Sequence, residues 1–452
     1  MIRRTAAELA RITNGEVRGD AAAAVTGVAI DSRAVRGGDL FVALEGARVD
    51  GHDFVAQATA AGAGAALVAR PVNAPVAQVV AADTIGALQR IAADERRAAA
   101  FHLAAITGSI GKTTTKEAAA ALLATTFRVG STQGNRNSET GFPAELCNQP
   151  AGIEWMVAEL GMSHAGELGR LGAVAQPDAL LYTVVAPVHL EFFRDVDAIA
   201  EAKAELIPYL RADGLLVLNA ADARVAAFAG RFAGRVVRYG VAHASDLWIE
   251  GYRERGLLGS SFELAGALGP VAVSCPLPGR HQADNVLAAA ALALALGVPA
   301  GRIASAAAAL RPAPRRGELH TIAPGVTLVD DSYNSSPAAV GALLGLLAGT
   351  PGRRVAVLGE MLELGPSSPE FHREAGRQAA AAAVVVVAVG GAPAAELARA
   401  ANGGTEAHYA ATAAEALELV RGILRRGDVV LVKGSRGIGL DALVDGLLGR
   451  AG

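Results

Sequence analysis

The sequence is poor in cysteine, in net charge and in long apolar runs. Cys147 and Cys275 are the only cysteines in 452 residues, which argues against a disulfide framework and indicates a reducing compartment. The formal net charge is −3, so no basic excess indicates nucleic acid as a partner. The longest apolar runs, at 379–389 and 286–295, are shorter than the ~20 residues that a membrane span requires. We therefore expect neither nucleic acid nor a membrane span.

An export signal is also missing from the N-terminal stretch. Glu8 stands where such a signal needs its apolar segment. Together with the cysteine usage, this predicts a cytoplasmic protein.

The length and pattern of the chain predict several domains. A chain of 452 residues is too long for one ordinary core. Residues 1–82 mix short apolar runs with Gly-rich turns, and a helical pattern at 83–98 opens a second stretch. Strands and helices then alternate to about residue 311, which is typical of a doubly wound parallel sheet. Pro312 and Pro314 mark a linker after it.

The last stretch indicates a second sheet, of Rossmann type. Its apolar strand patterns, separated by helical segments, lie at 326–330, 354–359, 384–390 and 428–434. We therefore predict an α/β protein of three domains, over residues 1–82, 83–313 and 314–452.

The sharpest motif is a glycine-rich turn between a strand at 101–107 and a helix that begins at Lys112. The turn carries Gly108 and Gly111 and continues into Thr113. Backbone N–H groups of such a loop surround phosphate oxygens at a helix N-terminus. Lys112 would reach the terminal phosphates and the Thr113 hydroxyl would hold Mg²⁺. Ile106 stands where the full Walker motif has glycine, so this is the shorter form. A chance turn is the alternative, but strand, Gly-Lys-Thr and helix together favour a nucleotide site.

Three polar residues follow the loop. Glu159 ends an apolar strand, and an acid at the carboxyl end of a strand beside a phosphate loop commonly serves the metal. His189 follows another strand, and Lys203 lies on a helical segment. Each has an ordinary structural alternative: a capping glutamate, a structural histidine and a solvated lysine.

The order of these motifs resembles that of the Mur ligases along nearly the whole chain. Thr107–Lys116, Glu159-Leu-Gly-Met, His189-Leu-Glu and Ala202-Lys-Ala-Glu carry the resemblance in the middle stretch. Asp31-Ser-Arg, with the blocks at 38–46 and 50–54, is similar to the UDP-binding N-terminal domain of that family. The segment 279–289 resembles its adenine-contacting segment, and 134–143 its Asn-rich loop, although 138–140 departs from the usual pattern. The blocks at 331–334, 358–365 and 433–436 resemble its C-terminal domain.

The resemblance implies a set of site residues and cofactors. It implies ATP and two Mg²⁺ ions, with Lys203 carbamylated by CO₂. The implied metal ligands are Thr113, Glu159, His189 and the carbamate of Lys203, and the implied catalytic residues are Lys112, Glu159, His189 and Lys203. The implied ATP-binding residues are Gly108, Ser109, Ile110, Gly111, Lys112, Thr113, Thr114, Asn135, Asn285, Arg316 and Asp331. The implied substrate-binding residues are Ser32, Arg33, Tyr333, Asn334, Lys433, Ser435 and Arg436.

The resemblance also implies an activity. Mur ligases phosphorylate a carboxylate with ATP and join the acyl-phosphate to an amine. Several C-terminal blocks resemble the branch that adds D-alanyl-D-alanine to UDP-N-acetylmuramoyl-tripeptide in peptidoglycan synthesis, and we expect a monomeric enzyme of that kind. Ser335-Ser336 stands where that branch commonly has Ala-Asn.

Other activities stay open at this point. A Mur ligase for a diamino acid generally carries Asp-Asn-Pro-Arg, which is missing here, and tends to have His where this chain has Asn334. Folylpolyglutamate synthase is a further ligase alternative. A GTPase switch would show Asn-Lys-x-Asp, which is also missing, whereas a P-loop motor stays open. The sequence does not distinguish diaminopimelate from lysine in the tripeptide.

Overall fold

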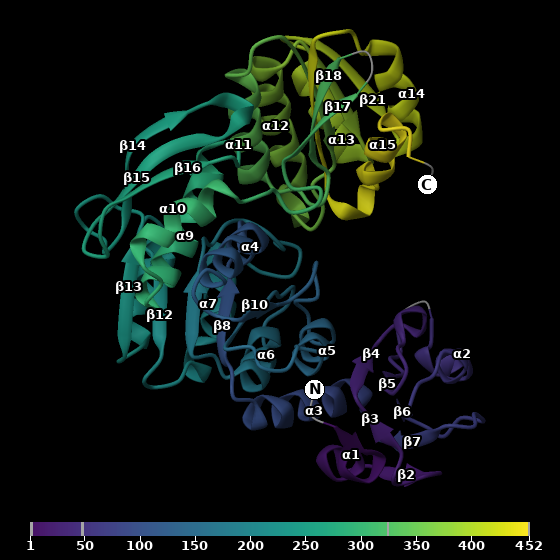
Figure 1. The fold of residues 1–452 in the computed structure, drawn as a ribbon. Coiled ribbons are helices and arrows are strands. Elements are labelled where there is room, and N and C mark those ends of the chain that lie inside the picture. Colours follow the sequence, from purple (N-terminus) through teal and green to yellow (C-terminus); the bar gives the residue numbers. More distant parts are fainter. Residues whose placement is uncertain (1–2, 47–48, 323–324, 451–452) are drawn as a thin grey trace.

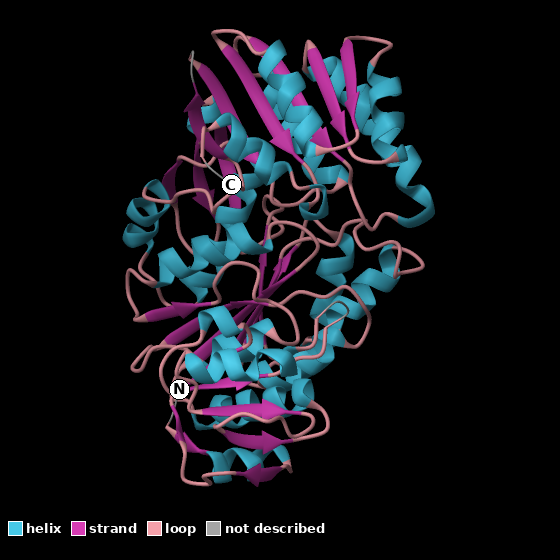
Figure 2. Cartoon of the chain, turned by 90° about the vertical axis from the view of Figure 1, so that its right-hand side faces the viewer, coloured by secondary structure: helices cyan, strands magenta, loops and turns pink. Residues whose placement is uncertain are grey.

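The computed structural model describes residues 3–46, 49–322 and 325–450. It shows sheets with covering helices in three successive parts of the chain (Figure 1). The N-terminal part lies at one end of the molecule and the C-terminal part at the other, with the central part between them (Figure 2). The predicted three-part α/β architecture is confirmed.

The N-terminal part is built on a five-stranded sheet in the order β2-β7-β6-β5-β4. All neighbours in it are parallel except β2 and β7. Its strands are β2 (Glu16–Arg18), β4 (Gly27–Ala29), β5 (Asp39–Val42), β6 (Ala65–Val68) and β7 (Ala77–Val80). The short strands β1 (Arg4–Thr5) and β3 (Ala24–Val25) pair beside it, and α1 (Ala6–Thr13) and α2 (Val55–Ala60) pack on it.

The helix α3 (Thr84–Ala98) joins this part to the central one. Its buried face includes Leu88, Ile91 and Ala92, as the sequence predicts. It packs on α1 on one side and on α5 (Gly141–Cys147) and α6 (Glu167–Ala175) on the other, so one apolar cluster runs through both parts. The two parts therefore share a core.

The central part has a six-stranded, all-parallel sheet in the order β13-β12-β11-β8-β10-β9. Its inner strands are apolar throughout because helices cover both faces. The strands are β8 (His102–Thr107), β9 (Val129–Ser131), β10 (Trp155–Glu159), β11 (Ala179–Tyr182), β12 (Leu215–Asn219) and β13 (Arg235–Tyr239). The further helices are α4 (Lys112–Leu123), α7 (Val196–Ala204), α8 (Ala223–Ala227), α9 (Arg280–Ala295) and α10 (Ala300–Ala308).

The predicted alternation of strands and helices is wrong between residues 248 and 275. There β14 (Trp248–Glu254), β15 (Ser260–Ala265) and β16 (Val271–Cys275) form a separate antiparallel sheet. The reason is a period of two: in β15, Phe262 and Leu264 are buried between more exposed neighbours. Such a strand covers a core with one face only, which suits an antiparallel sheet and not a doubly covered parallel one.

The C-terminal part has a six-stranded sheet in the order β17-β18-β22-β19-β20-β21. The four strands predicted from the sequence are parallel, and β17, which the sequence analysis missed, is an antiparallel edge strand. The strands are β17 (Glu318–Ile322), β18 (Val326–Asp331), β19 (Arg353–Gly359), β20 (Val385–Val389), β21 (Glu406–Ala410) and β22 (Asp428–Lys433). The helices are α11 (Pro337–Ala348), α12 (Ser368–Ala382), α13 (Ala392–Ala401), α14 (Ala413–Ile423) and α15 (Leu440–Leu447).

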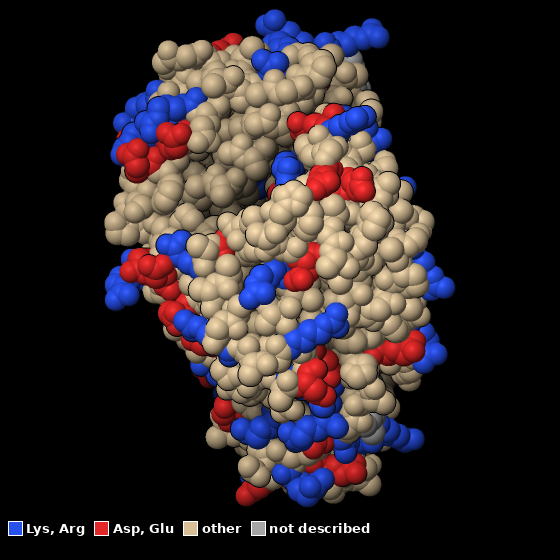
Figure 3. Space-filling model, turned by 90° about the vertical axis from the view of Figure 1, so that its left-hand side faces the viewer, with Lys and Arg blue, Asp and Glu red and all other residues tan. Residues whose placement is uncertain are grey.

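The surface agrees with the near-neutral composition. On the face in Figure 3, acidic and basic side chains are interspersed over the whole length of the molecule. None of the described helices combines the length and apolarity needed to cross a membrane.

Candidate active site

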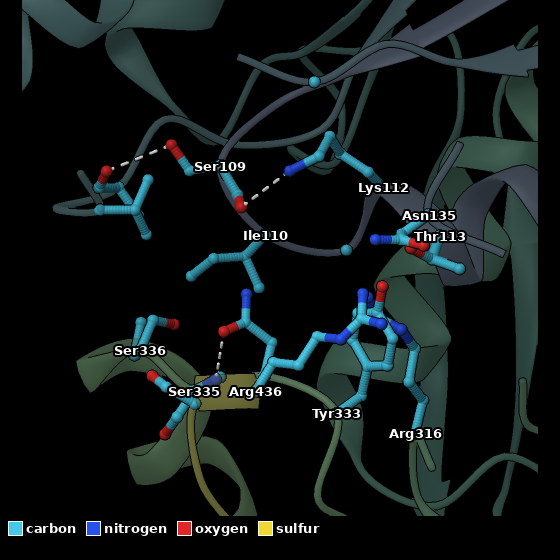
Figure 4. A pocket seen from close by; sticks show the side chains of 18 of the residues that line it. Ser109, Ile110, Lys112, Thr113, Asn135, Arg316, Tyr333, Ser335, Ser336 and Arg436 are labelled. Carbon is cyan, nitrogen blue, oxygen red and sulfur yellow. Dashed lines mark hydrogen bonds between the residues drawn. The ribbon is translucent and has the colours of Figure 1, made fainter. Parts of the chain in front are cut away.

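A cavity of about 600 Å³ lies between the central and the C-terminal parts. One wall carries the phosphate loop, and the opposite wall carries C-terminal residues that include Tyr333, Ser335, Ser336 and Arg436 (Figure 4). Most of the residues predicted to bind ATP or the amine substrate thus lie around a single space.

The two glycines of the phosphate loop are required by close neighbours. Gly108 has φ +146°, and a Cβ there would lie 1.9 Å from Oγ1 of Thr183. Gly111 has φ +84°, and a Cβ there would lie 2.3 Å from Oδ1 of Asn285. Any side chain would push the loop off β11 or off α9, so the turn must be made by glycine.

Lys112 folds back over this loop. Its Nζ donates to the carbonyl oxygens of Gly108 at 3.0 Å and of Ser109 at 3.2 Å. Burial lowers the pKa of Lys112, and the nearby Glu159 carboxylate opposes that shift. The ammonium group is therefore held against the backbone of the loop at 108–111.

Glu159 is fixed by three hydrogen bonds at the end of β10, two to its carboxylate and one from its backbone. Thr113 Oγ1 donates to its Oε2 and Asn137 Nδ2 to its Oε1, both at 2.7 Å. Its backbone N–H donates to Oγ1 of Thr132 at 3.1 Å. A buried carboxylate beside the threonine hydroxyl is an oxygen-rich pair of the kind that Mg²⁺ prefers, so the donor set fits the predicted metal.

His189 lines the same cavity and faces the C-terminal part. Its Nδ1 contacts Oε2 of Glu363, and this hydrogen bond lowers the pKa of the Glu363 carboxyl. The backbone N–H of Glu191 also donates to the Glu363 carbonyl at 3.2 Å. Glu363 belongs to the block at 358–365, but no sequence signal singles it out within that block.

Lys203 lies behind the cavity and does not line it. It is 1% exposed on α7, and its Nζ makes no hydrogen bond or ion pair within the described parts of the chain. Burial lowers its pKa well below the usual value, and the positive charge of Lys112 adds to the shift. The solvated lysine weighed from the sequence is therefore excluded, and burial favours the uncharged form of the amine.

Lysine is rare in this chain, and its few positions are informative. The sequence contains only four lysines, Lys112, Lys116, Lys203 and Lys433; all other basic residues of the Lys and Arg types are arginines. The last three lysines are each at most 3% exposed. Nζ of Lys116 donates to the Thr132 carbonyl at 2.6 Å and thereby ties α4 to the loop that holds Glu159. The sequence analysis missed Lys116, although the scarcity of lysine could have indicated it.

Asn135, Asn285, Arg316 and Asp331 line the cavity together with Thr114. Asn285 receives a hydrogen bond from Thr115 Oγ1 at 3.4 Å, which places it against the start of α4. The guanidinium of Arg316 lies 4.3 Å from the centre of the Tyr333 ring.

The C-terminal wall is held together by Lys433. Its Nζ donates to Asp331 Oδ1 at 2.6 Å and to the Asn334 carbonyl at 2.9 Å. Ser435 Oγ accepts from the N–H of Leu362 at 3.0 Å. The guanidinium of Arg436 lies 5.7 Å from the Tyr333 ring, so this ring has a cation near it from two segments of the chain.

Ser32 and Arg33 lie in the N-terminal part and do not line this cavity. Ser32 Oγ donates to Gln57 Oε1 at 3.1 Å. Arg33 is 82% exposed at its side chain and pairs with Asp31, which lowers the pKa of that carboxyl to about 2. They form a separate candidate site in the N-terminal part.

Residues 138–140 depart from the family pattern and have local roles here. Ser138 Oγ accepts from the N–H of Gly141 at 3.2 Å at the start of α5. Glu139 pairs with Arg170 of α6.

Within the described ranges, the three-residue cluster with metal-ligand spacing is Glu318, His320 and Asp330. None of these three is a predicted metal ligand.

Known proteins are similar to this chain in sequence and in architecture. Residues 24–112 match the Mur ligase family catalytic domain, 106–293 the Mur ligase middle domain, and 315–436 the Mur ligase glutamate ligase domain. The UDP-N-acetylmuramoyl-tripeptide--D-alanyl-D-alanine ligase of Escherichia coli (strain K12) is 35% identical, with 99% of both chains covered. The Bacillus subtilis (strain 168) protein of that name is 31% identical with the same coverage. This chain belongs to the Mur ligase family.

Solved structures of Mur ligases agree with the assignment. MurF from Acinetobacter baumannii superposes with a TM-score of 0.89 at 31% identity over 99% of each chain. MurF from Thermotoga maritima in complex with ADP gives 0.80 at 28% identity, covering 93% of this chain and 96% of that one. Folylpolyglutamate synthase of Mycobacterium tuberculosis, at 0.66 and 18% identity, shares the fold alone.

Proposed function

We propose that this Mur ligase joins D-alanyl-D-alanine to UDP-N-acetylmuramoyl-tripeptide with ATP, giving the pentapeptide, ADP and phosphate in peptidoglycan synthesis. Relatives that carry this activity in their name match the chain from end to end. The observation that carries the proposal is the cavity, in which the phosphate loop faces C-terminal residues across one space.

The chemistry needs two steps at one place. A carboxylate oxygen of the tripeptide attacks the γ-phosphorus of ATP, and ADP leaves. The amine nitrogen of the dipeptide then attacks the acyl carbon, phosphate leaves with the electron pair of the C–O bond, and the nitrogen loses a proton. Phosphoryl transfer depends on positioning and on cations near the transferring oxygens, and Lys112 and Arg316 are cations that line the cavity.

The cavity also suits an acyl-phosphate, which must meet the amine before it meets water. Walls from two parts of the chain enclose the reacting groups and reduce the access of solvent. The phosphate loop at 108–114 would bind ATP, together with Asn135, Asn285, Arg316 and Asp331. Tyr333, Asn334, Lys433, Ser435 and Arg436 would face the incoming amine.

Two Mg²⁺ ions and a carbamate on Lys203 are part of the proposal. Bound Mg²⁺ neutralises charge on the phosphate oxygens. Thr113, Glu159 and His189 would be ligands, and the Glu159 pair described above supports this. An uncharged, unpaired amine is the form of lysine that can add CO₂, which supports Lys203 as the carbamylated residue.

The proposed function also includes a site for the UDP group, the bounds of three domains, a monomeric state and a cytoplasmic location. Ser32 and Arg33 would bind the UDP group in an N-terminal domain of residues 1–82. The ATP-binding domain would comprise 83–313 and the C-terminal domain 314–452. We propose a monomer that acts in the cytoplasm.

The test is ADP release by the purified protein with UDP-muramoyl dipeptides and tripeptides, each offered D-Ala-D-Ala, meso-diaminopimelate, L-Lys or L-Glu. We expect release with the tripeptide and D-Ala-D-Ala together. If the enzyme extends the dipeptide with a single diamino acid and ignores D-Ala-D-Ala, the branch is wrong while the ligase chemistry stands. ATP turnover that needs neither acceptor nor amine would instead indicate a P-loop switch or motor.

A further inference from the structure

The helix α11 begins in the wall of the cavity opposite the phosphate loop, and its N-terminus is uncapped. Ser336 is the N-cap residue, yet its side chain makes no capping hydrogen bond. Pro337 has no N–H, so the free donors of the first turn are those of Ala338 and Ala339. The first backbone bond of the helix is from Val340 N–H to the Ser336 carbonyl, at 2.9 Å. Two N–H groups therefore remain available beside the cavity.

The hydroxyl groups next to this helix end also lack partners. Ser336 is 6% exposed and lines the cavity, and its hydroxyl has no hydrogen bond within the described residues. Ser335 Oγ is buried without a hydrogen-bond partner among the same residues. Figure 4 shows both side chains on the wall that faces the phosphate loop. Buried hydroxyls are normally satisfied, so Ser335 Oγ indicates a polar group of a ligand at this wall, and Ser336 Oγ beside it is free to donate to such a group.

The C-terminal wall of the cavity carries three cationic side chains, Arg316, Lys433 and Arg436, against the two carboxylates of Asp331 and Glu363. Lys433 is already paired with Asp331, but Arg436 lines the cavity without an ion pair to any described carboxylate. The helix dipole adds partial positive charge at the N-terminus of α11. A carboxylate is the ligand group that matches N–H donors at a helix N-terminus together with a hydroxyl.

The neighbouring surface of α11 is apolar and shallow. Ala339, Ala342 and Leu343 line the cavity and share one helix face, because they are spaced by three and four residues. Small side chains leave room for methyl groups and exclude water from them. A carboxylate subsite next to such a face suits the C-terminal half of a dipeptide of alanine.

We infer that the N-terminus of α11, with Ser336 Oγ, binds the terminal carboxylate of the incoming dipeptide, while Ala339, Ala342 and Leu343 contact its methyl groups. This inference rests on the proposed function and identifies where the amine substrate is held. Ser336 is thus a residue that determines specificity for a free carboxylate.

The test compares D-Ala-D-Ala with D-alanyl-D-alaninamide, which has the same methyl groups but no terminal charge. For the unmodified enzyme we expect a KM for the amide at least about tenfold higher, since a hydrogen bond to a charged group contributes about a factor of ten. Ser336→Ala should raise the KM for D-Ala-D-Ala about tenfold, leave that for the amide unchanged, and keep kcat and the KM for ATP within about twofold.

A matched variant controls for loss of a helix cap. Thr412 is the N-cap of α14, and its hydroxyl accepts from the N–H of Glu415. Thr412→Ala should leave both dipeptide KM values unchanged. Ser336→Ala removes a side chain without a hydrogen bond in the described structure, so it should fold as well as the unmodified enzyme.

Direct binding separates this inference from the proposed function. Titration calorimetry of each dipeptide into the enzyme with UDP-tripeptide and a non-hydrolysable ATP analogue should show weaker binding of the amide. Equal binding of both dipeptides, equal effects of Ser336→Ala on both, or an effect on ATP alone would overturn the subsite. If the enzyme ligates D-Ala-D-Ala and D-alanyl-D-alaninamide equally well, the carboxylate subsite is wrong but the proposed ligase function stands. If the enzyme binds D-Ala-D-Ala more tightly than the amide but ligates neither, the subsite stands and the proposed function is wrong.

Discussion

The Glu363 carboxylate of the C-terminal part contacts the imidazole of His189 in the central part. Both residues have left-handed backbone conformations, with φ 64° and φ 56°. Such conformations are uncommon for residues other than glycine and are held only where the surrounding structure requires them. The contact therefore links the two walls of the cavity and fixes the orientation of the His189 imidazole.

We expect Glu363→Ala to lower kcat at least about tenfold, because a carboxylate that orients a histidine ligand commonly contributes that much. Steady-state ADP release measures this, and the thermal unfolding transition should change little. Glu374→Ala is the matched control on α12, where the carboxylate pairs only with exposed Arg377 and Gln378. A Glu363 variant as active as the Glu374 variant would show that the contact has no role in turnover.

The sequence was most informative where chemistry constrains residue types. The phosphate loop was predictable since only glycine fits at Gly108 and Gly111, and the burial of β8 made its strand an unbroken apolar run. The β14–β16 sheet was missed because its period-of-two pattern was taken as part of the alternation of strands and helices. The edge strands β17 and β21 were missed because each has only one buried residue, which gives a weak apolar pattern.

The site could be predicted in part, for a similar reason. The glycine-rich loop indicated Lys112, and an acid at the end of an apolar strand indicated Glu159; both residues line the cavity. The partnership of His189 with Glu363 joins residues 174 apart in the chain, and no local pattern encodes such a contact. The burial of Lys203 could not be predicted either, because which face of α7 is buried depends on how the helix packs against the rest of the protein.

Lys203→Ala should abolish ligation, and short-chain carboxylates such as acetate should restore part of it by replacing the carbamate. The expectation follows from the buried, unpaired amine. ADP release with and without the additive measures both effects. Glu201→Ala on the same helix, whose carboxylate is exposed and pairs with Arg231, should need no additive. Near-normal activity of the Lys203 variant without additives would contradict the carbamate.

Lys203→Met should raise stability in CO₂-depleted, metal-free buffer. Burial depresses the folded-state pKa of Lys203 below its ordinary 10.5, so the unfolded chain binds an extra proton at lower pH. That linkage destabilises the unmodified protein most at low pH, and the penalty disappears as the pH rises through 10.5. The gain from methionine should therefore be larger at pH 7 than at pH 10 in urea titrations. A gain independent of pH would show that packing alone is responsible.

Arg33→Ala should raise the KM for the UDP-peptide and leave that for ATP nearly unchanged. The guanidinium lies in the N-terminal part, outside the cavity that holds the phosphate loop, so only ground-state binding of the nucleotide-linked substrate would be lost. Arg70→Ala is the matched control, as Arg70 is a second exposed arginine of this part and pairs with Asp50. The opposite pattern, with only the KM for ATP raised, would mean that Arg33 serves ATP.

Arg96→Ala should destabilise the chain by about 2–4 kcal/mol, since removing one member of a buried, hydrogen-bonded pair leaves the other without compensation. The guanidinium of Arg96 pairs with Asp178 at 2.7 Å and donates to the carbonyls of Ala175, Phe101 and Gln176. It thereby fastens α3 to the chain just before β8 and β11 of the central sheet, where the N-terminal and central parts share a core.

Arg97 on the next position of α3 is the matched control for this prediction. Its side chain is 57% exposed and pairs only with Asp94, so Arg97→Ala should change stability by less than about 0.5 kcal/mol. Urea titrations followed by circular dichroism measure both variants. If α3 were attached mainly through its apolar face, the two variants would unfold at the same urea concentration. A separate early transition in Arg96→Ala alone would instead show that this arginine couples the N-terminal part to the central sheet.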